Sequence, residues 1–289
     1  MYFERGHKLA VYAFSIAVAS ALFALIIHRG LYFPAEPYMI PLRQSLNNSI
    51  VMVLVIAIVF PAIVEFNNYR WLRGVDKNIP RLLRDVTEAV RSGVPLFKAL
   101  EDASARDYGP ISKPLEAAMV KFKLTSDLEG SLVWLGEELN RLAAKRMSTI
   151  LIEAYETGGR IIDVLDVGVD LFTSLDEYRE ERDAQMRPYL LIVYLGSFIF
   201  LVISWVILVQ FLTPLAAASA DPLVEQGGIL RNVLSIDYYK AVLMWAGVME
   251  ALLGGLVAGK ISEGRISVGL IHSVLLLIIT VVFFNMFSV

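Results

Sequence analysis

Cysteine is absent from this chain of 289 residues, and charged residues make up only 19% of it. The missing cysteines exclude disulfides, thiol catalysis and thiolate metal sites. Histidine is scarce as well, and His7, His28 and His272 are too scattered to predict a cluster of metal ligands. A net charge of −3, without a basic run interleaved with aromatics, gives no sign of nucleic-acid binding. We therefore expect no metal, no cofactor and no nucleic-acid partner.

Apolar residues dominate what is present. They make up 56% of the chain, and the mean hydropathy is +0.60, which is too apolar for a soluble domain of this length. A membrane-spanning helix needs about 20 apolar residues. Five stretches come near this length: 9–27, 46–64, 189–213, 241–259 and 266–284. The sequence predicts an all-α polytopic membrane protein with about five transmembrane helices, in contact with membrane lipid.

The distribution of lysine and arginine predicts the orientation. Placing the N-terminus in the cytoplasm puts 22 of the 26 basic residues on the cytoplasmic side. The basic residues closest to the membrane ends agree with this choice: Arg5, Lys8, Arg70, Arg73, Arg187, Lys260 and Arg265. We expect the N-terminus inside, the C-terminus outside and the region between the second and third spans in the cytoplasm.

That region, residues 65–187, carries 22 acidic and 18 basic side chains, and its apolar residues recur at helical spacing. It predicts a cytoplasmic antiparallel bundle of about six helices, between a transmembrane hairpin (1–64) and three further spans (188–289). The first bundle helix is expected to have Pro80 in its first turn, the fourth to begin at a capping box of Ser126 and Glu129, and the fifth to begin near Met147.

The last bundle helix is expected to run from about Ile161 to Pro188, where the third span begins, because no helix breaker lies between them. Its end, DEYREERDAQMR at 176–187, has 8 charged residues in 12. This stretch is either a solvated helix face or a rigid link that carries movement between bundle and membrane.

The stretch 254–273, GGLVAGKISEGRISVGLIHS, contains Gly254, Gly259 and Lys260 at the spacing of a phosphate-binding loop. Such a loop needs Ser or Thr directly after the lysine and a strand before the first glycine. Here Ile261 follows the lysine, and an apolar helical run precedes the glycine. We therefore interpret the glycines as part of a membrane helix and expect no nucleotide site.

Three segments and their order resemble the type II secretion F domain: LLRDVTEAVRSGVPLFKALEDAS (82–104), DLEGSLVWLGEEL (127–139) and LIEAYETGGRIIDVLDVGVDLF (151–172), followed by a span at RPYLLIVYLGSFIFLV. The stretch 254–273 is similar to the tail of archaeal members. The family comprises membrane platform proteins of type IV pili, type II secretion systems and archaella. The resemblance implies a non-enzymatic platform that couples a hexameric secretion ATPase to insertion of pilin-like subunits. Archaellar platforms commonly carry two such domains and this chain has one, so a second copy either comes from another chain or is not needed. We expect a second platform copy as a partner, in a homo-oligomer or as a related platform subunit.

Small residues recur every four positions in the fourth span, at Gly247, Ala251, Gly255 and Gly259. They predict close helix packing, either within this chain or against a pilin or a second copy. Glu250 lies beside this stripe, where a lone charge would cost about 3 kcal/mol or more. We expect His272 to be its partner. A small transporter or channel that uses Glu250 and His272 is the alternative function.

An up-and-down bundle places its first, third and fifth turns at the end far from the membrane. These turns, at 91–95, 121–126 and 157–161, contain no acid and hold four basic residues: Arg91, Lys121, Lys123 and Arg160. We predict this basic tip as the ATPase contact, with ordinary solvated turn residues as the alternative. The acids Glu137, Glu138, Glu153 and Glu156 are interpreted as surface charge, because no compact loop of oxygen ligands surrounds them.

Overall fold

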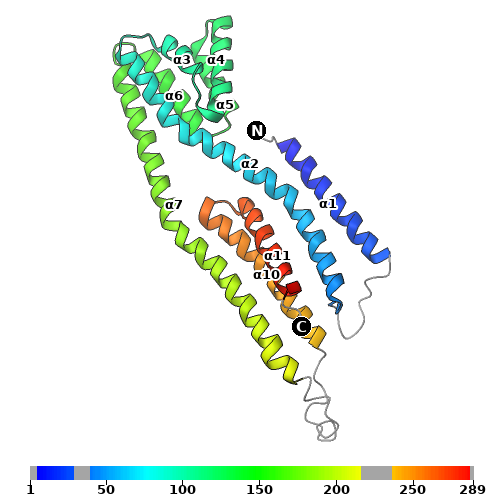
Figure 1. Cartoon of the computed structure of the whole chain (residues 1–289). Coiled ribbons are helices and arrows are strands. Elements are labelled where there is room, and N and C mark those ends of the chain that lie inside the picture. The colour runs from blue at the N-terminus through cyan, green and yellow to red at the C-terminus, as the bar shows by residue number, and fades with distance from the viewer. Residues whose placement is uncertain (1–4, 29–39, 216–235, 287–289) are drawn as a thin grey trace, which may run out of the picture. The chain divides into compact units, whose positions relative to one another are not determined.

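The computed structural model describes residues 5–28, 40–215 and 236–286 (Figure 1). Every regular element in these ranges is a helix, and five helices are long and apolar enough to cross a membrane. The predicted all-α polytopic fold is confirmed. By their contacts, the described residues divide into two compact units: residues 67–184 form one, here called the bundle, and the remainder form the other, here called the membrane unit. The extreme termini, whose sides of the membrane were predicted, lie outside the described ranges.

The membrane unit contains all five predicted spans. They lie in α1 (Arg5–His28), the first part of α2 (Gln44–Arg91), the last part of α7 (Ile161–Val206) with the π-helical η2 (Ile207–Leu212), α10 (Ile236–Glu263), and η3 (Ile266–Val268) with α11 (Gly269–Met286). Val51 of α2, Leu201 of α7, Val248 of α10 and Leu277 of α11 pack together at the centre. Four of the spans therefore share one apolar core. The fifth span, α1, packs against α2.

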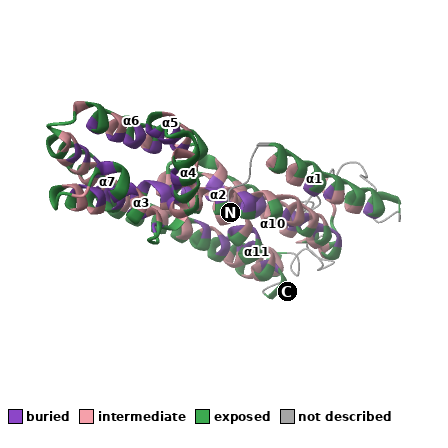
Figure 2. Cartoon of the chain, turned by 90° about the horizontal axis from the view of Figure 1, so that it is seen from above, coloured by how far each residue is buried: buried purple, intermediate pink, exposed green. Residues whose placement is uncertain are grey.

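The bundle has six helices, as predicted. They are the last part of α2, α3 (Leu96–Ser104), α4 (Ser112–Thr125), which the short η1 (Gly109–Ile111) precedes, α5 (Leu128–Glu138), α6 (Leu142–Thr157) and the first part of α7. Leucines at helical spacing form its core, and Leu82, Leu100, Leu132 and Leu151 are completely buried. Figure 2 shows buried residues (purple) alternating with exposed ones (green) along the helices of the bundle.

Three predicted helix boundaries were wrong. Pro80 is not in the first turn of a helix but lies inside α2. A proline at this position removes one backbone hydrogen bond, and the helical turns before and after it keep the long helix continuous. Asp127 rather than Ser126 caps α5: its carboxylate accepts from the Gly130 backbone N–H at 2.9 Å, while Ser126 takes the left-handed conformation that ends α4. The fifth helix, α6, begins at Leu142 instead of near Met147.

Contacts with α2 show the order in which the turns alternate. The turn before α4 packs beside the start of the α2 bundle stretch, where Pro110 fills the space left by Gly74. The turn before α6 reaches the same part of α2, where Arg141 binds Asp76. The end of α2 meets the start of α7 through Arg91 and Asp166. The second and fourth turns therefore lie beside Gly74 and Asp76, where α2 enters the bundle. The first and fifth turns lie near Arg91, where α2 ends.

Candidate functional site

The small residues of α10 pack against α11 within this chain. Gly255 lies directly against the backbone of Ser273, and Gly259 lies against that of Gly269, so neither position has room for a methyl group. Gly247 faces Thr280 and Phe200, and Ala251 is completely buried. This side of α10 is therefore occupied by the chain's own helices.

Glu250 and His272 are not partners, and the predicted contact between them was wrong. Glu250 accepts a hydrogen bond from Ser197 at 2.5 Å. His272 instead contacts the Tyr194 hydroxyl at 2.7 Å through Nδ1, and its Nε2 lies 3.8 Å from the Glu263 carboxylate. The hairpin register explains the error: since Gly255 faces Ser273 and Gly259 faces Gly269, Glu250 stands level with Ile278, about 9 Å along the axis from His272.

Both polar contacts tie the hairpin to the same helix. Tyr194 and Ser197 lie one turn apart on α7 and therefore on one face of it. The first holds His272 of α11, and the second holds Glu250 of α10. A charge-capable group in a membrane interior is expected to face protein and find a partner. Here the partners fasten α7 to the α10–α11 hairpin.

Polar contacts also join the first two helices to each other and to the hairpin. Glu65 of α2 forms an ion pair with Lys8 at 2.8 Å and accepts a hydrogen bond from Tyr12, both on α1. At the other end of the span, the buried Asn47 accepts from the Trp245 indole N–H at 3.1 Å. These contacts were missed in the sequence because the residues are 53 to 198 positions apart.

The glycine and lysine pattern of residues 254–260 lies inside α10, which is helical from Ile236 to Glu263. Its backbone N–H groups are used in the helix and cannot surround a phosphate. Lys260 donates to the backbone carbonyl of Gly264 at 3.1 Å and so closes the turn into η3.

Two of the four predicted tip cations are paired with acids of neighbouring helices. Arg91 binds both oxygens of Asp166 on α7, at 2.7 and 2.8 Å. Lys123 binds Glu101 on α3 at 2.5 Å, and Lys98 reaches the same carboxylate at 2.7 Å. The hydrogen bonds from Lys123 and Lys98 lower the pKa of Glu101 to about 2. Pairing partly compensates these charges, which the three turn sequences alone did not indicate.

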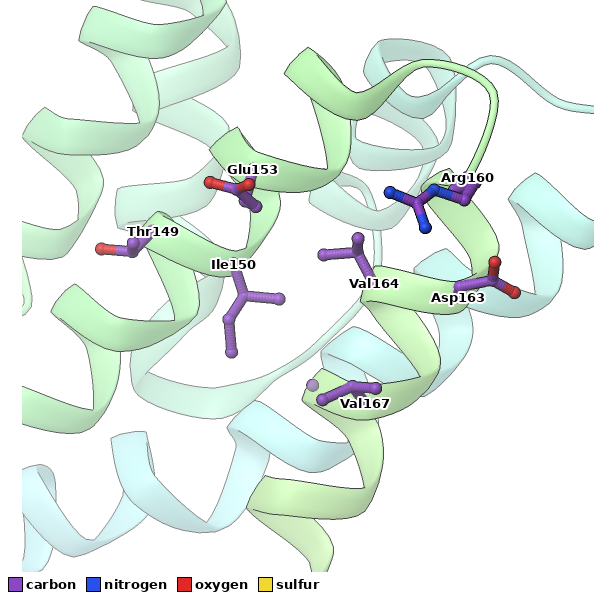
Figure 3. A pocket seen from close by; sticks show the side chains of 8 residues that line it. Thr149, Ile150, Glu153, Arg160, Asp163, Val164 and Val167 are labelled. Atoms are coloured by element: carbon purple, nitrogen blue, oxygen red, sulfur yellow. The ribbon is translucent and has the colours of Figure 1, made fainter.

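The other two tip cations have different surroundings. The Lys121 ammonium lies 5.8 Å from the centre of the Trp134 ring and 3.5 Å from the Gly130 carbonyl oxygen. Arg160 lies on the border of a groove between α6 and α7, in which Glu153 and Asp163 are also found (Figure 3). The four residues therefore do not form one uncompensated positive surface.

A charged cluster that the sequence did not reveal lies where the bundle stretch of α2 begins. The Asp76 carboxylate is only 7% exposed and accepts from two nitrogens of Arg141, with Arg179 of α7 at 3.5 Å. Beside it, Arg73 of α2 binds Asp183 of α7 at 2.5 Å. A buried carboxylate needs such partners to stay ionised. This cluster joins α2, α7 and the turn before α6.

The buried Tyr108 anchors the turn that precedes α4. Its hydroxyl donates to Asp85 at 2.6 Å, and the Arg81 guanidinium lies 5.4 Å from its ring centre. Burial and the hydrogen bond to Asp85 raise the pKa of Tyr108 to about 12. In the ranges that the structure describes, no three His, Asp or Glu side chains gather in a way that would hold a metal ion.

These observations define a multi-pass helical membrane protein whose second and third spans are separated in the chain by a compact helical bundle. Residues 82–209 match the family model described as Type II secretion system (T2SS), protein F. Over these residues the chain is similar to the type II secretion F-domain family, as its sequence suggested. Proteins of this family are non-catalytic membrane platforms that work with secretion ATPases and pilin-like subunits.

An uncharacterised protein of Methanocaldococcus jannaschii is 26% identical to this chain over 214 residues. The match covers 73% of this chain and 34% of the relative, so the chain spans about a third of that protein's length. No solved structure gave a significant match.

Proposed function

We propose that this chain is the platform subunit of a type IV pilus-like machine, an archaeal pilus or archaellum. In this function it couples a hexameric cytoplasmic secretion ATPase to the insertion of pilin-like subunits, and it works beside a second platform copy. The bundle lies in the cytoplasm, the N-terminus inside and the C-terminus outside.

The observation that supports this proposal most directly is the continuity of α7 across the matched segment. The family match ends at residue 209, so it includes both the bundle part of α7 and most of its span. The helix runs unbroken from Ile161 to Val206 and passes through Pro188. In the membrane unit its face holds Glu250 and His272 of the hairpin. A displacement of the bundle end of α7 would therefore act on α10 and α11.

Interrupting this helix tests the coupling. A gene deletion in the native host should abolish the extracellular filament, and the wild-type chain should restore it. Seven residues rich in Gly, Ser and Pro, inserted after Ala184, should not restore the filament although the protein reaches the membrane. Seven helix-forming residues at the same point preserve the helix phase to within about 20° and should restore much more.

Two results would contradict the proposal. One is a deletion strain with a normal filament count and normal secretion. The other is equal restoration by the flexible and the helical insertion, which would show that α7 transmits nothing.

The ATPase contact is proposed at the basic tip, Arg91, Lys121, Lys123 and Arg160. Reversing Lys121, Lys123 and Arg160 to Glu should weaken ATPase binding in a salt-dependent way without affecting membrane insertion. Reversing Lys145 and Arg146 is the control, since both lie in the first turns of α6, away from the tip.

The ion pair of Lys123 with Glu101 requires a further control. The double reversal Lys123→Glu with Glu101→Lys restores this pair, while Lys98 loses Glu101 and keeps Asp102 as its partner. If it fully restores ATPase binding, the single reversal acted through the fold. Equal weakening by the tip and the α6 reversals would show that the tip is not the contact.

The alternative, a small transporter or channel that uses Glu250 and His272, has less support. Such a path would bring the two groups into contact, whereas each is held separately by α7.

A further inference from the structure

A groove separates α6 from the first turns of α7 (Figure 3). It has a volume of about 400 Å³ and is open to solvent. Ile150 of α6 and Val164 of α7 face each other across it, with Val167 one turn further along α7. Gly168 allows α7 to approach Ile150 closely, since a methyl group at position 168 would lie 2.8 Å from an Ile150 methyl carbon.

The floor of the groove is apolar and accessible. Val167 is 69% exposed, and Leu171, one turn further on α7, is 43% exposed. The opposite face of the same helix packs into the bundle core, where Leu165 and Phe172 are buried. Exposed apolar side chains that line a concave surface are typical of a binding site.

The border of the groove is acidic. Glu153 and Asp163 line it together with Arg160. Glu156 and Asp170 lie one or two turns further on the same faces of α6 and α7, and both are exposed. None of these four carboxylates has an ion-pair partner within the described ranges. In the lining of the groove, Glu153 and Asp163 thus stand against Arg160. Among the exposed charges one or two turns away on the same helix faces, Glu156 and Asp170 stand against Arg146 of α6.

We infer that this groove binds a basic amphipathic helix of a partner protein. Leucine-like side chains at positions i, i+3, i+4 and i+7 of that helix contact Ile150, Val164 and Val167. Lysines and arginines on its flanks meet Glu153, Glu156, Asp163 and Asp170. The acidic border would repel nucleic acid or an anionic membrane surface, which leaves a basic protein segment as the occupant. This inference goes beyond the platform function and does not depend on it.

The test uses the full-length chain in detergent and a defined probe. The probe is a fluorescein-labelled peptide of 18 residues with leucine at the i, i+3, i+4 and i+7 positions and lysine elsewhere, compared with the same peptide carrying glutamate for lysine. Fluorescence anisotropy should show saturable binding of the lysine peptide and none of the glutamate peptide. Val167→Glu, and separately Glu153→Lys with Asp163→Lys, should each weaken binding about tenfold or more.

Matched controls lie on α5, outside the groove. Val133 is 45% exposed, so Val133→Glu makes the same change at a similar apolar surface. Glu137→Lys with Glu138→Lys makes the same charge change, and both controls should bind the lysine peptide as the wild type does. If Val167→Glu fails to fold by circular dichroism, the Glu153 and Asp163 variant still gives the answer, because both side chains are exposed.

Three results would overturn the inference: no binding of the lysine peptide, equal binding of both peptides, or equal weakening by the groove and control variants. Concentration-dependent self-association that Val167→Glu abolishes would also overturn it, since the occupant would then be a second copy of this chain. None of these results bears on filament assembly in the deletion strain, so failure here is distinguishable from failure of the platform function.

Discussion

Replacing Gly269 by alanine tests how closely α10 and α11 approach. A methyl carbon at this position would lie 2.7 Å from the Gly255 carbonyl oxygen, 2.7 Å from the Leu256 Cα and 2.8 Å from the Leu256 oxygen. All three are backbone atoms, which cannot rotate away as a side chain can. Since carbon contacts are optimal at about 3.5 to 4.0 Å, the two helices must separate by about 1 Å.

The energetic cost follows from this separation. A gap of about 1 Å forfeits up to about half of the dispersion energy of each contact across it. The contacts at risk include those of Ala251 and Val248 on α10 and of Leu276 and Leu277 on α11, all buried in the core of the membrane unit. Overpacking typically costs about 1 to 3 kcal/mol, and this site lies at the upper end because only backbone surrounds it. We expect Gly269→Ala to destabilise the membrane unit by about 3 kcal/mol.

Unfolding by SDS titration in mixed micelles measures this change. Trp245 of α10 reports on the hairpin because its indole donates to the buried Asn47. The control is Gly196→Ala on α7, where nothing lies within 4 Å of the added methyl. This variant should be neutral or stabilised by up to about 1 kcal/mol, because alanine favours the helix over glycine. Equal stability of the Gly269 and Gly196 variants would refute the close approach.

Other predictions concern the polar contacts. Glu250→Leu and His272→Leu should destabilise additively within about 0.5 kcal/mol, since the groups have different partners, and a larger coupling in a double-mutant cycle would show that they touch. Arg141→Met should destabilise the bundle by about 3 kcal/mol in chemical unfolding by leaving Asp76 buried with less compensation, and adding Asp76→Leu should recover part of the loss; a further loss would contradict this. Tyr108 has a raised pKa of about 12, so its stabilising contribution is complete below pH 10 and is lost as the pH rises to 12. The stability difference between wild type and Tyr108→Phe should therefore shrink over that range, and a constant difference would contradict the assignment.

The sequence by itself determined the fold class. Apolar runs of span length and the helical spacing of bundle leucines, such as Leu82 and Leu132, indicate structure within one or two helical turns, so they can be recognised locally. The order of the three F-domain segments also indicated the family, which the match over residues 82–209 supports. Helix ends depend on contacts outside the local pattern. Pro80 and Ser126 were misread because neighbouring turns of α2 and the Asp127 carboxylate decide them.

Only the tertiary structure decided which polar groups are partners. Counted from the turn at 260–265, Glu250 and His272 lie at depths close enough for a contact. The register of α10 on α11 nevertheless separates them. That register depends on where Gly255 and Gly259 meet Ser273 and Gly269, which no local pattern specifies. The same holds for the tip: its turns contain no acid, yet Asp166 and Glu101 reach Arg91 and Lys123 from other helices. The electrostatic environment and the burial of a side chain depend on neighbours that are distant in the sequence. They are therefore decided only when the helices pack together.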